Sequence, residues 1–221
     1  MTRPLKAIAV TAVAAALLLT AGCASSEDEP TPSSTTAVTS DAPLASTVPP
    51  PPAGYTVVTA AANKIQVPLP SDLQVLDPSQ MDINPDSQQT FAAMAQELGM
   101  TADDLKQQIS TLDLYAIDTD TNNINILQPL PAIGTKLADV QPTLVDIGAS
   151  DISSNEATCP TGPVLVVTYT LAGGDVPMNQ TQLYAQTDTM TTTVITITGV
   201  TWTPDQVAQI AATMLAGLQH V

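Results

Sequence analysis

An apolar run near the amino terminus limits how this chain can fold, because it separates a leader from the part that can form a domain. Residues 7–19 are uncharged Ala, Val, Ile, Leu and one Thr, and they follow the basic residues Arg3 and Lys6. The run holds 13 residues, whereas a helix that spans a bilayer needs about 20 apolar residues. A basic start followed by a short apolar run is typical of a secretory signal peptide. We therefore expect an exported protein whose folded body begins after this leader.

The residues that follow the run point to a lipid anchor. Ala21-Gly22-Cys23 resembles the bacterial lipobox, in which the cysteine thiol is joined to diacylglycerol and the signal is cut just before it; Thr20 stands where that motif usually has Leu. The resemblance implies a signal peptide over residues 1–22 and a Cys23 that carries diacylglycerol and fatty acids such as palmitate. It also implies attachment to the extracytoplasmic face of the cell membrane. The alternative is a signal cut at a neighbouring alanine, which leaves Cys23 unmodified or removes it.

A tether separates the anchor from the folded part. Residues 23–54 are rich in Ser, Thr, Pro, Ala and acidic residues and include Pro49-Pro50-Pro51-Pro52. Such a composition has too little apolar surface to fold, and its prolines favour extended backbone. We expect one globular domain over residues 55–221, held away from the membrane by this tether.

The charge balance excludes one large class of partners. Without Arg3 and Lys6, three lysines face 21 acidic residues, which gives a net charge of −18 and leaves no arginine. Nucleic-acid binding depends on Lys and Arg that displace counterions from phosphates. Adhesion to an anionic membrane depends on the same residues. We therefore expect no nucleic-acid partner, and membrane attachment only through the lipid on Cys23.

The residue types needed for common catalytic and metal sites are scarce. The only histidine is His220, beside the carboxyl end, so we expect neither a nucleophile–histidine catalytic pair nor a zinc site. We assign no catalytic residue, no metal and no cofactor. If Cys23 is lipidated, Cys159 has no partner for an internal disulfide, and we expect it to be buried or to lie in a loop.

One segment imitates the start of a calcium-binding loop. Asp118, Asp120 and Asn122 have the spacing of the first EF-hand ligands, but Asn123 holds the glycine position and Pro129 the glutamate position. We favour a solvated turn between two strands over weak calcium binding.

The apolar periodicity of residues 55–221 predicts alternating strands and helices. Strands are expected over 55–58, 64–69, 112–117, 124–127, 155–159, 163–171, 181–187 and 191–198. Helices are expected over 84–99, from Thr101 onward, over 136–147 with a kink or break at Pro142, and from Thr203 to the end. Strand 163–171 carries apolar residues at both parities, so both of its faces should be covered. The order indicates an α+β fold, namely an α/β/α sandwich with a mainly antiparallel sheet and helices on both faces.

A family resemblance accompanies this order of elements. Residues 123–127, Asn-Ile-Asn-Ile-Leu, follow a hairpin, and Gln182-Leu183-Tyr184 is followed by a Thr-rich strand and an amphipathic last helix. The pattern resembles the PsbP-type fold, which also occurs in small exported lipoproteins of the LpqN type. This resemblance implies an accessory or binding module with no common active site.

We therefore expect a non-enzymatic binding or accessory module that acts on an envelope protein or an apolar small molecule. The first alternative is a carrier of lipid or a small hydrophobic molecule, with a pocket between helix and sheet lined by Phe91, Met94 and Met214. The second alternative is a hydrolase that uses carboxylates alone. The sequence leaves the oligomeric state open.

Overall fold

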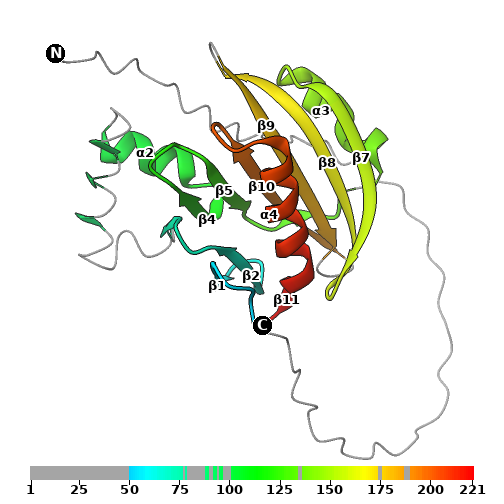
Figure 1. The fold of residues 1–221 in the computed structure, drawn as a ribbon, viewed down its shortest axis with the longest axis horizontal. Helices are drawn as coiled ribbons and strands as arrows, with labels where there is room; N and C mark the ends of the chain where they lie inside the picture. Colours follow the sequence, from blue (N-terminus) through cyan, green and yellow to red (C-terminus); the bar gives the residue numbers. More distant parts are fainter. Residues whose placement is uncertain are drawn as a thin grey trace, which may run out of the picture.

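The computed structural model describes residues 50–76, 78, 88–89, 92–93, 95–96, 101–133, 136–173, 176–186 and 190–221 (Figure 1). The predicted signal peptide and nearly all of the tether, including Cys23, lie outside these residues, as do Phe91 and Met94. The predicted helix 84–99 is described only at 88–89, 92–93 and 95–96, and these positions are helical. Within the described ranges, no helix has the length and hydropathy of a membrane span.

An eight-stranded antiparallel sheet forms the centre of the fold. Its strands run in the order β3-β4-β5-β10-β9-β8-β7, and β6 pairs with β10 outside that path. The strands are β3 (Gln74–Leu76), β4 (Leu112–Ile117), β5 (Asn123–Leu127), β6 (Leu130–Pro131), β7 (Ser150–Cys159), β8 (Gly162–Gly173), β9 (Val176–Gln186) and β10 (Thr191–Gly199). The predicted hairpin of residues 112–127 is confirmed as β4 paired with β5, and the antiparallel pairing of 181–187 with 191–198 is confirmed as β9 with β10.

A second, three-stranded sheet holds the first two predicted strands. β1 (Tyr55–Ala60) pairs with β2 (Ile65–Pro70), and β11 (Gln219–His220) pairs with the other edge of β2. The expectation of a single sheet is therefore wrong. β11 was not expected either, because its two residues carry too little pattern to be recognised as a strand.

Capping residues start two of the three described helices as the sequence predicts. α2 (Ala102–Ile109) begins after Thr101, whose hydroxyl accepts from the Asp104 backbone N–H. α4 (Pro204–Gly217) begins after Thr203, whose hydroxyl accepts from the Gln206 backbone N–H. Each is a capping box, in which the third helical residue bonds back to the cap.

α3 (Leu137–Asp146) is a single helix that contains Pro142. Of the two alternatives expected at Pro142, a kink or a break into two short pieces, the break is therefore wrong. Proline removes one backbone hydrogen bond from a helix interior. Val140 and Leu144, on either side of Pro142, are buried against the sheet, and this burial offsets the lost bond.

The sheet buries apolar side chains on both faces. The residues that pack with α4 come from one parity of β8, including Val164 and Val166, whereas Leu165 and Val167 pack with α3. Figure 1 shows α4 lying in front of β9 and β10, and shows α2 and α3 near opposite ends of the sheet. The expected antiparallel sheet and the double coverage of strand 163–171 are confirmed. The described chain is mostly sheet, with three described helices.

Candidate functional site

The turn between β1 and β2 is fixed to the large sheet by a buried polar cluster. Asp113 accepts from the backbone N–H groups of Ala62 and Asn63 at 3.0 and 2.9 Å and from Asn63 Nδ2 at 2.8 Å. Asn63 also donates to the Leu127 carbonyl and accepts from the Thr193 hydroxyl. These bonds join the two sheets, and both Asp113 oxygens are engaged. The role of the cluster is structural.

The segment that imitates a calcium loop is held by its own hydrogen bonds. Asp118 Oδ1 accepts from the backbone N–H groups of Asp120 and Asn122, and Asp118 Oδ2 accepts from Asn122 Nδ2. Asn122 Oδ1 accepts from three successive backbone N–H groups, at residues 200–202. These oxygens organise the turn and tie it to the start of α4. In the described part of the chain, no group of three or more His, Cys, Asp or Glu residues is placed to hold a metal.

A third set of polar side chains lies on the face of the large sheet that carries α3. We call it the polar band. It comprises two residues from each of three adjacent strands, and these residues form two rows across the sheet. The rows are Asn123, Thr198 and Gln180, and Asn125, Thr196 and Gln182, on β5, β10 and β9 respectively. Thr196, Thr198 and Gln180 are buried, and Asn123, Asn125 and Gln182 are half-buried. A polar stripe on an inner sheet face is unusual, because such faces are normally apolar.

Tyrosine hydroxyls orient part of the polar band. The Tyr184 hydroxyl donates to Gln182 Oε1 at 2.6 Å, and Gln182 Nε2 donates to Thr196 Oγ1 at 3.2 Å. On the next strand, the Tyr169 hydroxyl donates to Gln180 Oε1 at 2.7 Å. Both glutamine oxygens are therefore engaged, and the Gln182 amide nitrogen is bonded within the band.

Among the described residues, two buried polar side-chain atoms lack hydrogen-bond partners. They are the Tyr115 hydroxyl, on β4, and Gln108 Oε1, on α2. Tyr115 is 3 % exposed and pairs in register with Asn125, which puts it on the same sheet face as the band. Buried polar groups are nearly always satisfied, so each exception calls for an explanation.

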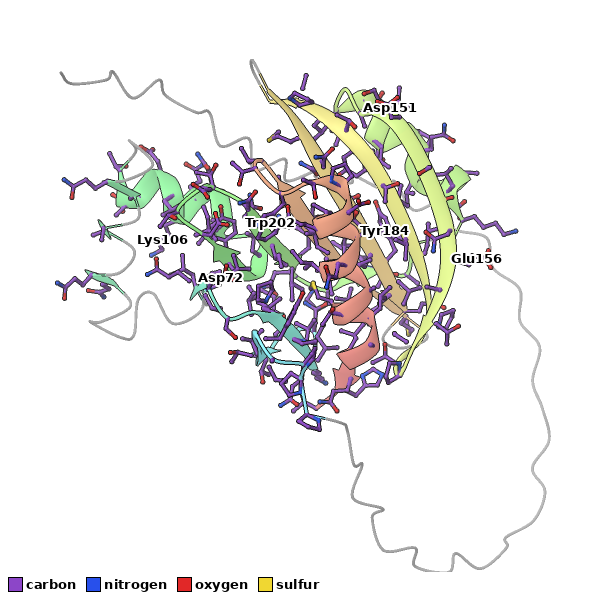
Figure 2. All side chains as sticks on the ribbon, in the orientation of Figure 1. Asp72, Lys106, Asp151, Glu156, Tyr184 and Trp202 are labelled. Atoms are coloured by element: carbon purple, nitrogen blue, oxygen red, sulfur yellow. The ribbon has the colours of Figure 1, made fainter. Side chains whose placement is uncertain are left out.

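The chemistry of the band is neutral. Its members are amides and hydroxyls, and the neighbouring tyrosines stay protonated. Burial raises the pKa of Tyr115 from 10.0 to about 12 and raises the pKa values of Tyr169 and Tyr184 further. Figure 2 shows Tyr184 near the centre of the molecule, whereas the labelled charged residues Asp72, Lys106, Asp151 and Glu156 lie toward its periphery. The band can therefore donate and accept hydrogen bonds, but it lacks a group that takes up or releases a proton near neutral pH.

Three of the residues that the sequence singled out, Met214, Cys159 and His220, lie within the described ranges, on three different elements. Met214 is completely buried in the core cluster under α4, on the sheet face opposite the band, and its predicted role in lining a pocket stays a prediction. Cys159 is free and buried, as predicted, and its sulfur contacts the Thr161 hydroxyl. His220 lies in β11, paired with Ile65.

Sequence reasoning missed the polar band, although one signal was present. The strand 191–198 has five threonines in eight residues. Those at even positions share a sheet face with Gln180 and Gln182, but this can be recognised only when the register of β9 and β10 is known.

Comparisons with known proteins show similarity at the level of structure. No protein-family model matches the chain, and no curated protein matches it. A solved structure, the solution structure of cyanobacterial PsbP (CyanoP) from Synechocystis sp. PCC 6803, superimposes with a TM-score of 0.47 at 10 % sequence identity. The match covers 76 % of this chain and 94 % of the CyanoP chain.

Proposed function

We propose that the chain is an extracytoplasmic lipoprotein, anchored through Cys23, whose domain is a non-enzymatic binding or accessory module of the cell envelope. The observation that carries the binding role is the polar band, because it gathers oriented hydrogen-bonding groups that have no means of proton transfer or nucleophilic attack. General acid–base catalysis needs a group whose pKa lies near the working pH. Buried phenols whose pKa values are raised stay protonated near neutral pH, so they exchange hydrogen bonds there but release no proton.

The sequence supports the location. The short apolar run and Ala21-Gly22-Cys23 indicate export with lipidation, and residues 23–54 supply a tether. As part of this proposal, the domain is an α/β/α sandwich of the PsbP type. Support for that arrangement comes from the packing of α3 and α4 against alternate residues of β8.

Membrane fractionation tests the proposed location. The wild-type chain should sediment with membranes and should resist extraction by high salt, because covalent lipid chains hold it there and screened charges do not. The variant Cys23→Ala should appear in the aqueous fraction. Cys159→Ala is the matched control, since it removes the other cysteine, and it should stay with the membrane. Release of the wild-type chain by salt would contradict the proposal.

A further inference from the structure

Strand β7 forms one edge of the large sheet. It pairs with β8 along one side, and the sheet order ends there. Within the described part of the chain, no hydrogen bond reaches the backbone of residues 153–158 from the other side. Figure 1 shows β7 at the outer border of the sheet. An edge of this kind presents a row of N–H and C=O groups onto which a further strand can be added.

The register of β7 on β8 shows which backbone groups face outward. Opposite residues in an antiparallel pair alternate between pairs that exchange two backbone hydrogen bonds and pairs that exchange none. Thr158 lies opposite Pro163, which has no N–H, so this pair is one that exchanges none. Counting back in twos from Thr158, the N–H and C=O groups of Glu156 and Ser154 also point away from β8. The edge therefore offers donors and acceptors at three alternate residues.

The same stretch is accessible and regular. The four successive residues 153–156 are exposed, so the strand is open on both faces there. Pairing with β8 is continuous from Ser153 to Cys159, and the irregularity lies earlier, between Ser150 and Ser153. Residues 153–158 contain neither lysine nor proline, which commonly protect a sheet edge. The opposite edge of the sheet, β3, has three residues and offers far less backbone to an added strand.

The charges of β7 select the chemistry of a partner. Asp151 and Glu156 are both exposed, and Figure 2 places them at the outer border of the sheet. Glu156 lies opposite Leu165, which packs with α3, so Glu156 is on that face of the sheet, beside any added strand. Opposite charges stabilise a cross-strand pair, whereas like charges directly across from each other destabilise it. A strand with lysine or arginine next to Glu156 therefore fits this edge.

A second copy of this chain fits the edge poorly. The strands of the large sheet contain no lysine or arginine in the described part of the chain, so the β7 edge of a second copy would bring only further carboxylates. The net charge of the chain is −16, so two copies also repel one another over longer distances. These charges favour a different, cationic protein as the occupant.

We propose that the β7 edge binds an extended, lysine- or arginine-bearing segment of another protein as an added strand of the large sheet. Strand addition to an exposed sheet edge is an established mode of peptide recognition. The segment's main chain pairs with the outward groups of Ser154, Glu156 and Thr158, and a basic side chain lies beside Glu156. This inference goes beyond the proposed function, because the surface is separate from the polar band and does not depend on the lipid anchor.

Fluorescence anisotropy with labelled synthetic peptides tests the inference on the full-length, detergent-extracted chain. The probe alternates threonine and lysine and matches β7 in length. One comparison peptide has glutamate in place of lysine. A second keeps the lysines but has two adjacent prolines at its centre, which interrupt strand pairing along both of its edges. We expect the uninterrupted lysine peptide to bind, and the other two to bind about tenfold more weakly or not at all.

Variants of the chain locate the binding. Ser154→Pro removes one outward N–H and leaves the hydrogen bonds to β8 in place, so it should weaken the affinity about tenfold, whereas Ser154→Ala keeps the N–H and should bind like the wild type. Glu156→Lys should weaken the affinity about fivefold. Asp72→Lys makes the same charge change at an exposed turn away from β7 and should have little effect. Circular dichroism checks that each variant is folded, and the proline-interrupted peptide tests the same pairing without altering the protein.

Four results would each overturn the inference. The first is equal binding of the proline-interrupted peptide, because charge alone would then explain the attraction. The second is equal binding of the glutamate peptide, and the third is full affinity in Ser154→Pro and Glu156→Lys. The fourth is a dimer in analytical ultracentrifugation that Ser154→Pro dissociates, since the occupant would then be a second copy. None of these results alters the outcome of membrane fractionation, so failure here is distinguishable from failure of the proposed function.

Discussion

Asn63 and Asp113 lie 50 positions apart in the sequence and are joined by two hydrogen bonds, one from the Asn63 backbone N–H and one from its side-chain amide. Both residues are buried, at 6 % and 7 % exposure. The pair fixes the β1–β2 turn against β4, so the small sheet has a set position on the large one. A carboxylate that accepts three N–H groups in a buried setting is costly to alter, because its donors would lose their partner.

The variant Asp113→Asn should destabilise the fold by about 3 kcal/mol, since an amide nitrogen would face N–H donors where an oxygen accepted them. Chemical denaturation measures the free energy of unfolding. Asp72→Asn, at an exposed turn, is the control and should change it by less than about 0.5 kcal/mol. Equal stability of the two variants would show that the cluster does not hold the sheets together.

Asn122 is the second structural anchor. Asn122→Ala should cost about 2–3 kcal/mol, because three backbone N–H groups at residues 200–202 would lose their acceptor next to the start of α4. The exposed Asn155→Ala serves as comparison. Calcium should not raise the thermal midpoint of the wild-type chain, since the Asp118 and Asn122 oxygens are already engaged; a clear rise would favour the cation site over the turn.

Tyr115→Phe should raise stability. Removing a buried hydroxyl that has no partner relieves its desolvation penalty, so we expect a gain of about 1 kcal/mol in the free energy of unfolding. Tyr184→Phe is the informative contrast, because it removes a hydroxyl bonded to Gln182 and should lower stability. If Tyr115→Phe were instead destabilising, the Tyr115 hydroxyl would have to be paired within the protein.

The three buried tyrosines predict a loss of stability at high pH. The folded-state pKa of Tyr115 is about 12, against 10.0 for the free side chain, so the unfolded chain releases its proton first as the pH rises. The stabilisation is complete below pH 10 and is lost as the pH rises from 10 to 12. Tyrosinate absorbance should show Tyr115, Tyr169 and Tyr184 ionising together with unfolding. Ionisation of all three in a still folded chain would refute this.

Local patterns predicted much of the fold. The helix start at Thr203 was recognisable because Thr203, Pro204 and Gln206 lie within four consecutive positions. Strand 112–117 was recognisable because its mainly apolar residues are followed by turn residues. Long-range relationships were not predictable. Asn63 gives no local sign that it pairs with Asp113, and β11 exists only because β2 offers an edge.

The candidate site escaped prediction for the same physical reason. Its residues come from three strands, and only register brings Asn125, Thr196 and Gln182 into one row. The sequence instead drew attention to apolar residues such as Met214, whose burial is explained by packing in the core.

The intact mass of the chain extracted from membranes tests the central claim, that this is a lipid-anchored envelope module. We predict a polypeptide that begins at Cys23 and carries the added mass of diacylglycerol and fatty acyl chains, with the same added mass absent from Cys23→Ala. A chain that begins at another residue, or that begins at Cys23 without any acyl mass, would contradict the account.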